Sequence, residues 1–191
     1  MNKKILKYQK NGYIFSKDVR DNNISTVYLT RMQKKGVISK VGRGIYVLND
    51  VIEDEMYLHS LNYSNLVYTH STALYLQGLS NSQLNILEAC FPFGTNPTYI
   101  PVKCYVTRDK KLYELGIEYV ETPSGNKVKC YDKERCICNL FLYDVYDDEL
   151  KSYAIKEYKK NYLNVEKLYK YAEELGCYKI IKTIFEVLMC D

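Results

Sequence analysis

The segment Gly12–Leu48, GYIFSKDVRDNNISTVYLTRMQKKGVISKVGRGIYVL, decides the fold of this chain of 191 residues. Its first part predicts a short helix, with Ser16 as the N-cap and an end near Arg20. A serine hydroxyl suits the N-cap because it accepts a hydrogen bond from a free backbone N–H group. The pair Asn22-Asn23 then predicts a turn, since asparagine tolerates the left-handed backbone conformation.

A second helix and a hairpin follow that turn. Ser25 should cap a helix over residues 26–35, and Gly36 should end it. The β-branched runs 37–41 and 45–48 flank a Gly-Arg-Gly turn, which is typical of a β-hairpin. A helix, a turn, a second helix and a hairpin, in this order, predict a winged helix-turn-helix.

The charge of the chain divides sharply between this N-terminal region and the rest. Residues 1–44 hold eight lysines and three arginines against two aspartates, which gives a formal charge of +9. Because the whole chain carries +4, the remainder carries −5. A basic first quarter followed by a mildly acidic body is typical of a nucleic-acid-binding domain attached to another domain.

The second helix has one face suited to a core and one suited to DNA. At 100° per residue, Tyr28, Leu29 and Met32 fall on one arc and should pack inward. The opposite arc offers hydroxyls, cations and a methyl surface, which are the groups that read base edges. Winged helices also bind proteins, but the charge and this arc favour DNA. The predicted DNA-binding residues are Ser25, Thr26, Val27, Thr30, Arg31, Lys34 and Lys35 on or beside the helix, and Lys40 and Arg43 on the wing.

The remaining chain, residues 51–191, predicts an α+β domain with a small sheet and a helical end. Turn-forming residues such as Pro123-Ser124-Gly125-Asn126 separate the expected elements. Strands are expected near residues 66–68, 85–91, 103–107, 117–121 and 127–131. Helices are expected at 53–62, from a cap at Thr69 or Ser71 to a stop at Gly78, from 132, and at 147–161, 165–175 and 178–189. The pattern predicts two domains, a DNA-binding domain over residues 1–50 and an α+β domain over residues 51–191 with a mixed or antiparallel sheet.

Composition argues against several other classes of protein. The seven cysteines include no Cys-x-x-Cys pair and the chain has only two histidines, so a zinc site is not expected. An odd number of cysteines without a signal-peptide core argues against disulfides, so most should be reduced core residues. Without an 18-residue apolar run, the protein is expected to be cytoplasmic and not in a membrane.

No group of residues predicts catalysis, so the chain is expected not to be an enzyme and to need no cofactor or metal. His70 beside Ser71 suggests a base and a nucleophile, but no G-x-S-x-G elbow surrounds them, and helix capping accounts for Ser71. Asp132 and Glu134 could hold a metal in a nuclease, but a capped helix start with an ion pair to Arg135 is the stronger interpretation.

Three motifs in order resemble the AbiEi-type antitoxin family, across about residues 12–145. They are Lys35-Gly36-Val37-Ile38 leading to Gly42-Arg43-Gly44-Ile45-Tyr46, then His70-Ser71-x-Ala73-Leu74-Tyr75-Leu76-x-Gly78-Leu79, then Val128-Lys129-Cys130-Tyr131-Asp132-x-Glu134-Arg135-x-Ile137-Cys138-Asn139-Leu140. Cys136 and Asn139 stand where the family more usually has Thr and Asp.

The resemblance implies an antitoxin and transcriptional autorepressor of a type IV toxin–antitoxin operon, which acts in abortive infection and phage defence. In such proteins the winged helix binds double-stranded DNA at inverted repeats in the promoter of the protein's own operon. The C-terminal domain neutralises a nucleotidyltransferase-like toxin, usually without a stable complex. The alternative from the residues alone is a winged-helix regulator whose C-terminal domain senses a small ligand.

Overall fold

The structure, a computed structural model, describes residues 2–97 and 100–189 and is a mixed α+β protein. Its described residues divide into two compact units. Unit 1 runs to Ser64 and also includes the turn Thr122–Asn126, whereas unit 2 holds Asn65–Glu121 and the residues from Lys127 onward. The functional boundary predicted after residue 50 stays a prediction.

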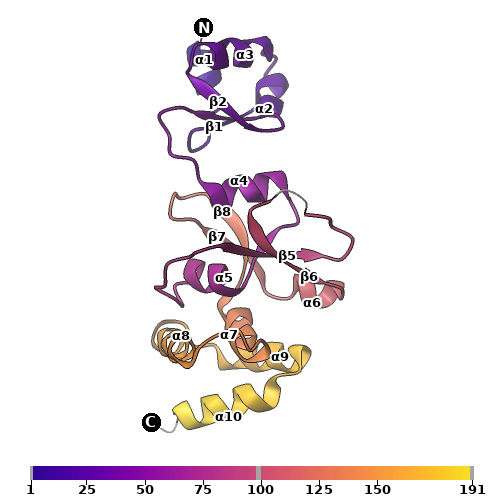
Figure 1. The fold of residues 1–191 in the computed structure, drawn as a ribbon, viewed down its shortest axis with the longest axis vertical. Coiled ribbons are helices and arrows are strands. Elements are labelled where there is room, and N and C mark those ends of the chain that lie inside the picture. The colour runs from indigo at the N-terminus through magenta and orange to yellow at the C-terminus, as the bar shows by residue number, and fades with distance from the viewer. Residues whose placement is uncertain (1, 98–99, 190–191) are drawn as a thin grey trace. The chain divides into compact units, whose positions relative to one another are not determined.

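Unit 1 combines short helices with a small antiparallel sheet (Figure 1). The strand order is β1-β3-β2, so the hairpin strand β3 lies in the centre. In chain order the elements are α1 (Asn2–Leu6), β1 (Tyr13–Phe15), α2 (Ser16–Asp21), α3 (Val27–Lys34), β2 (Ile38–Gly42), β3 (Ile45–Leu48) and α4 (Glu55–Asn62).

Side chains that point alternately to the two faces of this sheet give unit 1 two apolar layers. Ile14 packs on one face with residues of α1, α2 and α3, including Val19, Leu29 and Met32. Its neighbour Tyr13 packs on the other face with β3 and with apolar residues of α4. Successive residues of a strand point to opposite faces, so three residues of β1 serve both layers. Helix α4 is therefore part of the unit that holds the basic N-terminal region.

The predicted capping in unit 1 is wrong in detail. Ser16 is the first residue of α2 and not its N-cap, and its backbone N–H donates to the carbonyl of Gly44. The N-cap position of α3 is occupied by Thr26, without a side-chain hydrogen bond, although the Ser25 hydroxyl accepts from the N–H of Val27 at 3.4 Å. Strand β1 was not predicted, because its three residues form a strand only by pairing with β3, which the local sequence does not indicate.

Unit 2 contains a five-stranded mixed sheet in the order β6-β5-β4-β8-β7. The pairs β5–β6 and β4–β8 are parallel, and β4–β5 and β7–β8 are antiparallel, so the sheet is mixed, which is one of the two arrangements predicted. The elements are β4 (Val67–Tyr68), α5 (His70–Leu76), β5 (Leu87–Pro92), β6 (Val102–Thr107), α6 (Lys110–Glu114), β7 (Ile117–Glu121), β8 (Lys127–Tyr131), α7 (Lys133–Leu142), α8 (Asp148–Asn161), α9 (Val165–Leu175) and α10 (Tyr178–Met189).

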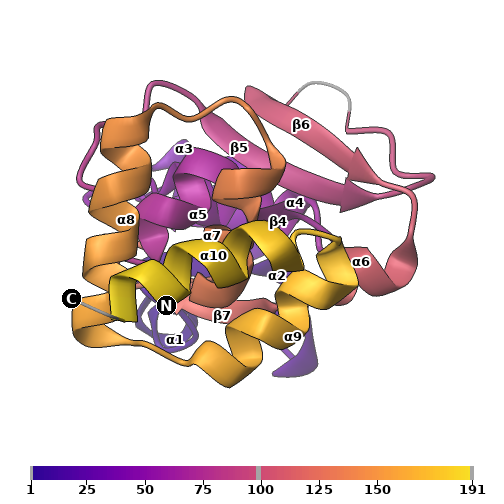
Figure 2. The same ribbon diagram turned by 90° about the horizontal axis from the view of Figure 1, so that it is seen from below.

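The helical end of unit 2 forms as predicted, with α8, α9 and α10 arranged around α7 (Figure 2). Asp132, Asp147 and Asn164 each cap a helix by accepting a backbone N–H, and Gly176 ends α9 at a φ of +77°. Tyr158 is buried, whereas Tyr162, directly after α8, is 46% exposed.

The cysteines of the described residues are all free. Five are buried and Cys104 is half-buried, as the prediction of reduced core residues requires, while Cys190 lies outside the described residues. None of the helices in the described ranges combines the length and the apolar character needed to cross a bilayer.

Candidate nucleic-acid interface

Helix α3 is held in unit 1 by its inner face. Leu29 and Met32 are buried, and Tyr28 is half-buried against the same apolar layer. The guanidinium of Arg31 lies 5.7 Å from the centre of the Tyr28 ring. A cation over an aromatic ring at an exposed site contributes about 0.5–1 kcal/mol, so Tyr28 restricts the orientation of Arg31 at the edge of the helix.

The outer face of α3 carries the residues predicted to contact DNA. Residues 27, 30, 31 and 34 recur at helical spacing and therefore form one stripe along the helix. Val27 is 55% exposed although it is apolar, and Thr30, Arg31 and Lys34 are exposed beside it. The stripe joins a methyl surface, a hydroxyl and two cations.

The remaining predicted residues, at the two ends of α3, differ in how exposed their side chains are. Ser25 is exposed, whereas Thr26 is half-buried, so Thr26 offers less of its side chain to a ligand. Lys35 is exposed directly after the last helical residue. Gly36 then turns the chain with a φ of +67°, a conformation that glycine adopts without the steric cost of a side chain.

The hairpin of β2 and β3 presents the other two predicted residues. Lys40 is exposed on β2, and Arg43 is exposed in the turn. The register between the strands shifts between Lys40 and Gly42, which marks a β-bulge and re-aims the strand end. The bond from the Ser16 N–H to the Gly44 carbonyl, 2.8 Å long, fixes the turn of this hairpin to the start of α2.

Positive charge on unit 1 is largely uncompensated. Every lysine and arginine described between residues 4 and 43 has an exposed side chain. Within that stretch the structure gives an ion pair only to Lys10, whose ammonium lies 3.1 Å from the Asp18 carboxylate. Lys17 and Arg20, both exposed on α2, were not among the predicted contacts. Their charge in a two-helix motif was the signal that could have identified them.

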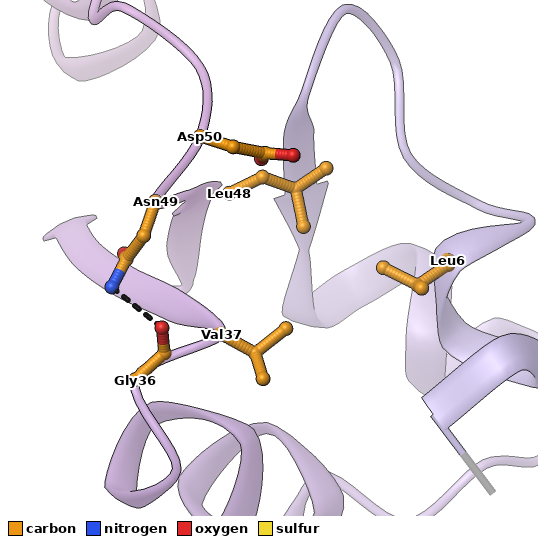
Figure 3. A pocket seen from close by; sticks show the side chains of 6 residues that line it. All are labelled: Leu6, Gly36, Val37, Leu48, Asn49 and Asp50. Carbon is orange, nitrogen blue, oxygen red and sulfur yellow. Dashed lines mark hydrogen bonds between the residues drawn. The ribbon is translucent and has the colours of Figure 1, made fainter.

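Asn49 was also missed, and it ties the end of α3 to the hairpin. Its amide donates to the Gly36 carbonyl at 2.9 Å and accepts from the Ser39 hydroxyl at 2.8 Å. An open hollow of about 460 Å³ lies beside it, with Leu6, Val37 and Leu48 as apolar lining and Asp50 at the side (Figure 3). The sequence signal was an asparagine directly after a strand, a residue that readily bonds to nearby backbone.

Residues 5–49 match the family model AbiEi_4, described as "Transcriptional regulator, AbiEi antitoxin". These residues are an AbiEi-type regulator domain. The match extends from α1 through β3 and confirms the family that the first motif indicated. It therefore includes α3 and the β2–β3 hairpin, which carry the predicted DNA-binding residues. The second and third motifs lie outside the matched residues. No curated protein matches the chain.

In unit 2, His70 and Ser71 are each bonded to other residues of the fold. The His70 ring shares a 3.0 Å hydrogen bond with the Thr69 hydroxyl and stacks on Tyr105 with ring centres 3.9 Å apart. Burial lowers the pKa of His70 to about 4. Thr69, one of the two expected caps of α5, occupies the N-cap position but makes no side-chain capping bond. The carboxylate of Glu88 accepts the N–H of Ser71 instead.

The carboxylates of Asp132 and Glu134 are buried and share one cation from α9. The Lys167 ammonium lies 3.0 Å from Asp132 and 2.7 Å from Glu134. The expected ion pair with Arg135 is therefore wrong. Arg135 donates instead to the Asn139 side chain and the Leu112 carbonyl. A metal ion at these carboxylates would have to displace the Lys167 ammonium.

Proposed function

We propose that the chain is the antitoxin and transcriptional autorepressor of a type IV toxin–antitoxin operon. Unit 1 supplies a winged helix in which α3 is the recognition helix and the β2–β3 hairpin is the wing. It binds double-stranded DNA at repeats in the chain's own promoter. The single observation that carries the DNA-binding part is the exposed Val27, Thr30, Arg31 and Lys34 stripe inside a domain that matches AbiEi regulators.

The chemistry of the stripe gives each residue a role. Arg31 and Thr30 can donate to base edges in the major groove, and Val27 can meet a thymine methyl group. Lys34 and Lys35 near the end of α3, Lys17 and Arg20 on α2, and Lys40 and Arg43 on the hairpin would neutralise phosphates. Phosphate contacts supply most of the affinity, and each good base contact adds about 1–3 kcal/mol of discrimination.

The antitoxin part of the proposal assigns toxin neutralisation to the C-terminal domain, without enzymatic activity or a cofactor. It is supported by the AbiEi match and by the second and third sequence motifs, which lie in unit 2. The bonding of His70, Asp132 and Glu134 within the fold supports a non-catalytic body, because each group is already engaged by protein partners. The toxin partner is a nucleotidyltransferase-like protein whose gene lies beside the gene for this chain. Both proteins act in the cytoplasm.

The test of DNA binding uses the promoter region upstream of the gene as a fluorescent duplex. The wild-type chain should bind it specifically, with an affinity that falls steeply as salt rises. Lys34→Ala should weaken binding to all sequences and reduce the slope of log K against log salt by about 0.9. Arg31→Ala should instead relax discrimination between the operator and point-mutated operators.

Lys170→Ala serves as the control, because it removes an exposed cation from α9 in unit 2. Its affinity and salt slope should equal those of the wild type. Unchanged operator binding in the folded Arg31→Ala/Lys34→Ala double variant would refute the recognition-helix assignment. In cells expressing the neighbouring toxin, that double variant should lose repression but still rescue growth; loss of both together would contradict the division of labour.

A further inference from the structure

Unit 1 contains a buried carboxylate that is balanced by hydrogen bonds alone. Asp54, the N-cap of α4, is only 6% exposed. Among the described residues it has no ion-pair partner. A buried charge without a cation is costly unless donors satisfy its oxygens. The stability of unit 1 therefore depends on the residues that donate hydrogen bonds to Asp54.

Two of the three donors come from a turn that is distant in sequence. One oxygen of Asp54 accepts the Tyr57 N–H within the α4 cap. The other accepts the Thr122 hydroxyl and, at 2.8 Å, the side-chain amide of Asn126. Thr122 and Asn126 are themselves 4% and 5% exposed. The turn Thr122–Asn126, between β7 and β8, is thus docked on Asp54.

The same turn is bonded to the sheet that carries the proposed wing. The Asn126 side chain accepts from the amide of Asn11, two residues before β1, at 2.9 Å. The hydroxyl of Tyr13, on β1, accepts the backbone N–H of Asp54 at 2.8 Å. Strand β1 pairs along its length with β3 of the hairpin. A continuous set of bonds therefore leads from the turn to the hairpin.

We propose that docking of the Thr122–Asn126 turn on Asp54 controls operator binding. Unit 1 binds DNA tightly with the turn docked and weakly with the turn released. The coupling rests on the DNA-binding function proposed above and adds its regulation. Release leaves Asp54 with a single donor, so the cap of α4 and the α4 side of the β1–β3 sheet loosen together. Whatever moves the β7–β8 hairpin in the C-terminal domain then changes DNA affinity.

Exchanging the Asp54 carboxylate and the Asn126 amide tests their contact directly. Asp54→Asn places two amides together, and Asn126→Asp places two buried carboxylates together. Each single variant should bind the operator about tenfold more weakly than the wild type. The double variant Asp54→Asn/Asn126→Asp restores an amide–carboxylate pair, and it still offers an acceptor to Asn11, so its affinity should recover. Ser124→Ala is the control, since Ser124 is exposed in the same turn.

Amide exchange on the wild-type chain tests the coupling without any substitution. The N–H groups of Thr122, Gly125 and Asn126 are all hydrogen-bonded within the turn. If the docked turn favours DNA binding, bound DNA must favour the docked turn by the same factor. Operator DNA should therefore slow exchange at these amides, and a turn with a purely structural role would show no change.

Unchanged exchange in the turn while the operator protects α3 would overturn the coupling. So would single variants that bind as tightly as Ser124→Ala, or a double variant that fails to recover. A wild-type chain that binds no operator would overturn the proposed function itself, and that outcome is distinct because it appears before any variant is compared.

Discussion

Replacing His70 with asparagine should remove a defined pH dependence from the stability of unit 2. His70 is 5% exposed, and its pKa falls from an ordinary value of 6.5 to about 4 because burial disfavours the charged ring. The unfolded chain therefore binds a proton at this site between these two values, and the folded chain does not. Stability rises with pH in that window and falls as the solution is acidified.

The magnitude follows from the size of the shift. One unit of pKa corresponds to about 1.4 kcal/mol, so His70 should cost unit 2 about 3 kcal/mol as the pH falls from 6.5 to 4. Above pH 6.5 the ring is neutral in both states and the contribution is fully present. Asparagine cannot titrate there, and it tolerates the positive φ of 51° that His70 adopts.

The assay is amide exchange or urea unfolding of the full chain at several pH values between about 4.5 and 7.5, read at amides of β5 and α5. The wild type should lose stability across this range faster than His70→Asn, since both chains share every carboxylate. His59→Asn is the control: burial also lowers the pKa of His59, but this residue belongs to unit 1. Parallel pH profiles for the wild type and His70→Asn would refute the reasoning.

Two further substitutions should lower the free energy of unfolding, measured with urea. Gly44→Ala should destabilise unit 1 by about 1–3 kcal/mol, because Gly44 has a φ of +75° and a new Cβ would lie 2.5 Å from the Ser16 hydroxyl. Gly36→Ala meets no atom within 4 Å and should cost less, and equal costs would contradict the steric argument. Lys167→Met should destabilise unit 2 by about 2–4 kcal/mol, because two buried carboxylates lose their shared cation. The exposed Lys170→Met on the same helix should change stability by less than about 0.5 kcal/mol, and similar losses in the two variants would exclude the shared-cation argument.

The parts of the fold that sequence predicts are those with local causes. The inner face of α3 follows from the spacing of Leu29 and Met32, and both are buried as expected. The start of α7 follows from its capping residue Asp132, whose side chain accepts a backbone N–H group as predicted. A cap and a helical stripe involve residues within one or two turns, so one sequence contains the whole signal.

The parts that sequence misses depend on distant partners. Strand β1 has three residues and exists as a strand through pairing with β3. Helix α6 is a single short segment capped by Asp109, too short for a periodic pattern. The pairing of Asp132 and Glu134 with Lys167 joins α7 to α9, and no spacing rule predicts it.

For the candidate site, the sequence identifies the exposed stripe of α3 but not the tertiary hydrogen bonds that hold the surrounding segments in place. Thr30, Arg31 and Lys34 are exposed as expected, since helix periodicity decides which face is free. Asp54 is bonded to the turn near residue 126, a partner that its sequence neighbourhood does not indicate. For Asn49, the sequence offered its place after a strand but not its bond to Gly36. Whether the stripe contacts DNA is decided by the binding measurements proposed above.

The division of unit 1 into two stretches of sequence has a consequence for the order of events on the ribosome. Synthesis proceeds from the N-terminus, and Thr122–Asn126 emerges only after β4 to β7 have been made. Unit 1 therefore cannot be completed while the nascent chain is short. Under the proposed coupling, a chain whose translation stops early would lack the turn and would bind the operator weakly. Under the proposed function, the operon would be silenced by chains that also carry much of the protective domain, and prematurely terminated products would leave it active.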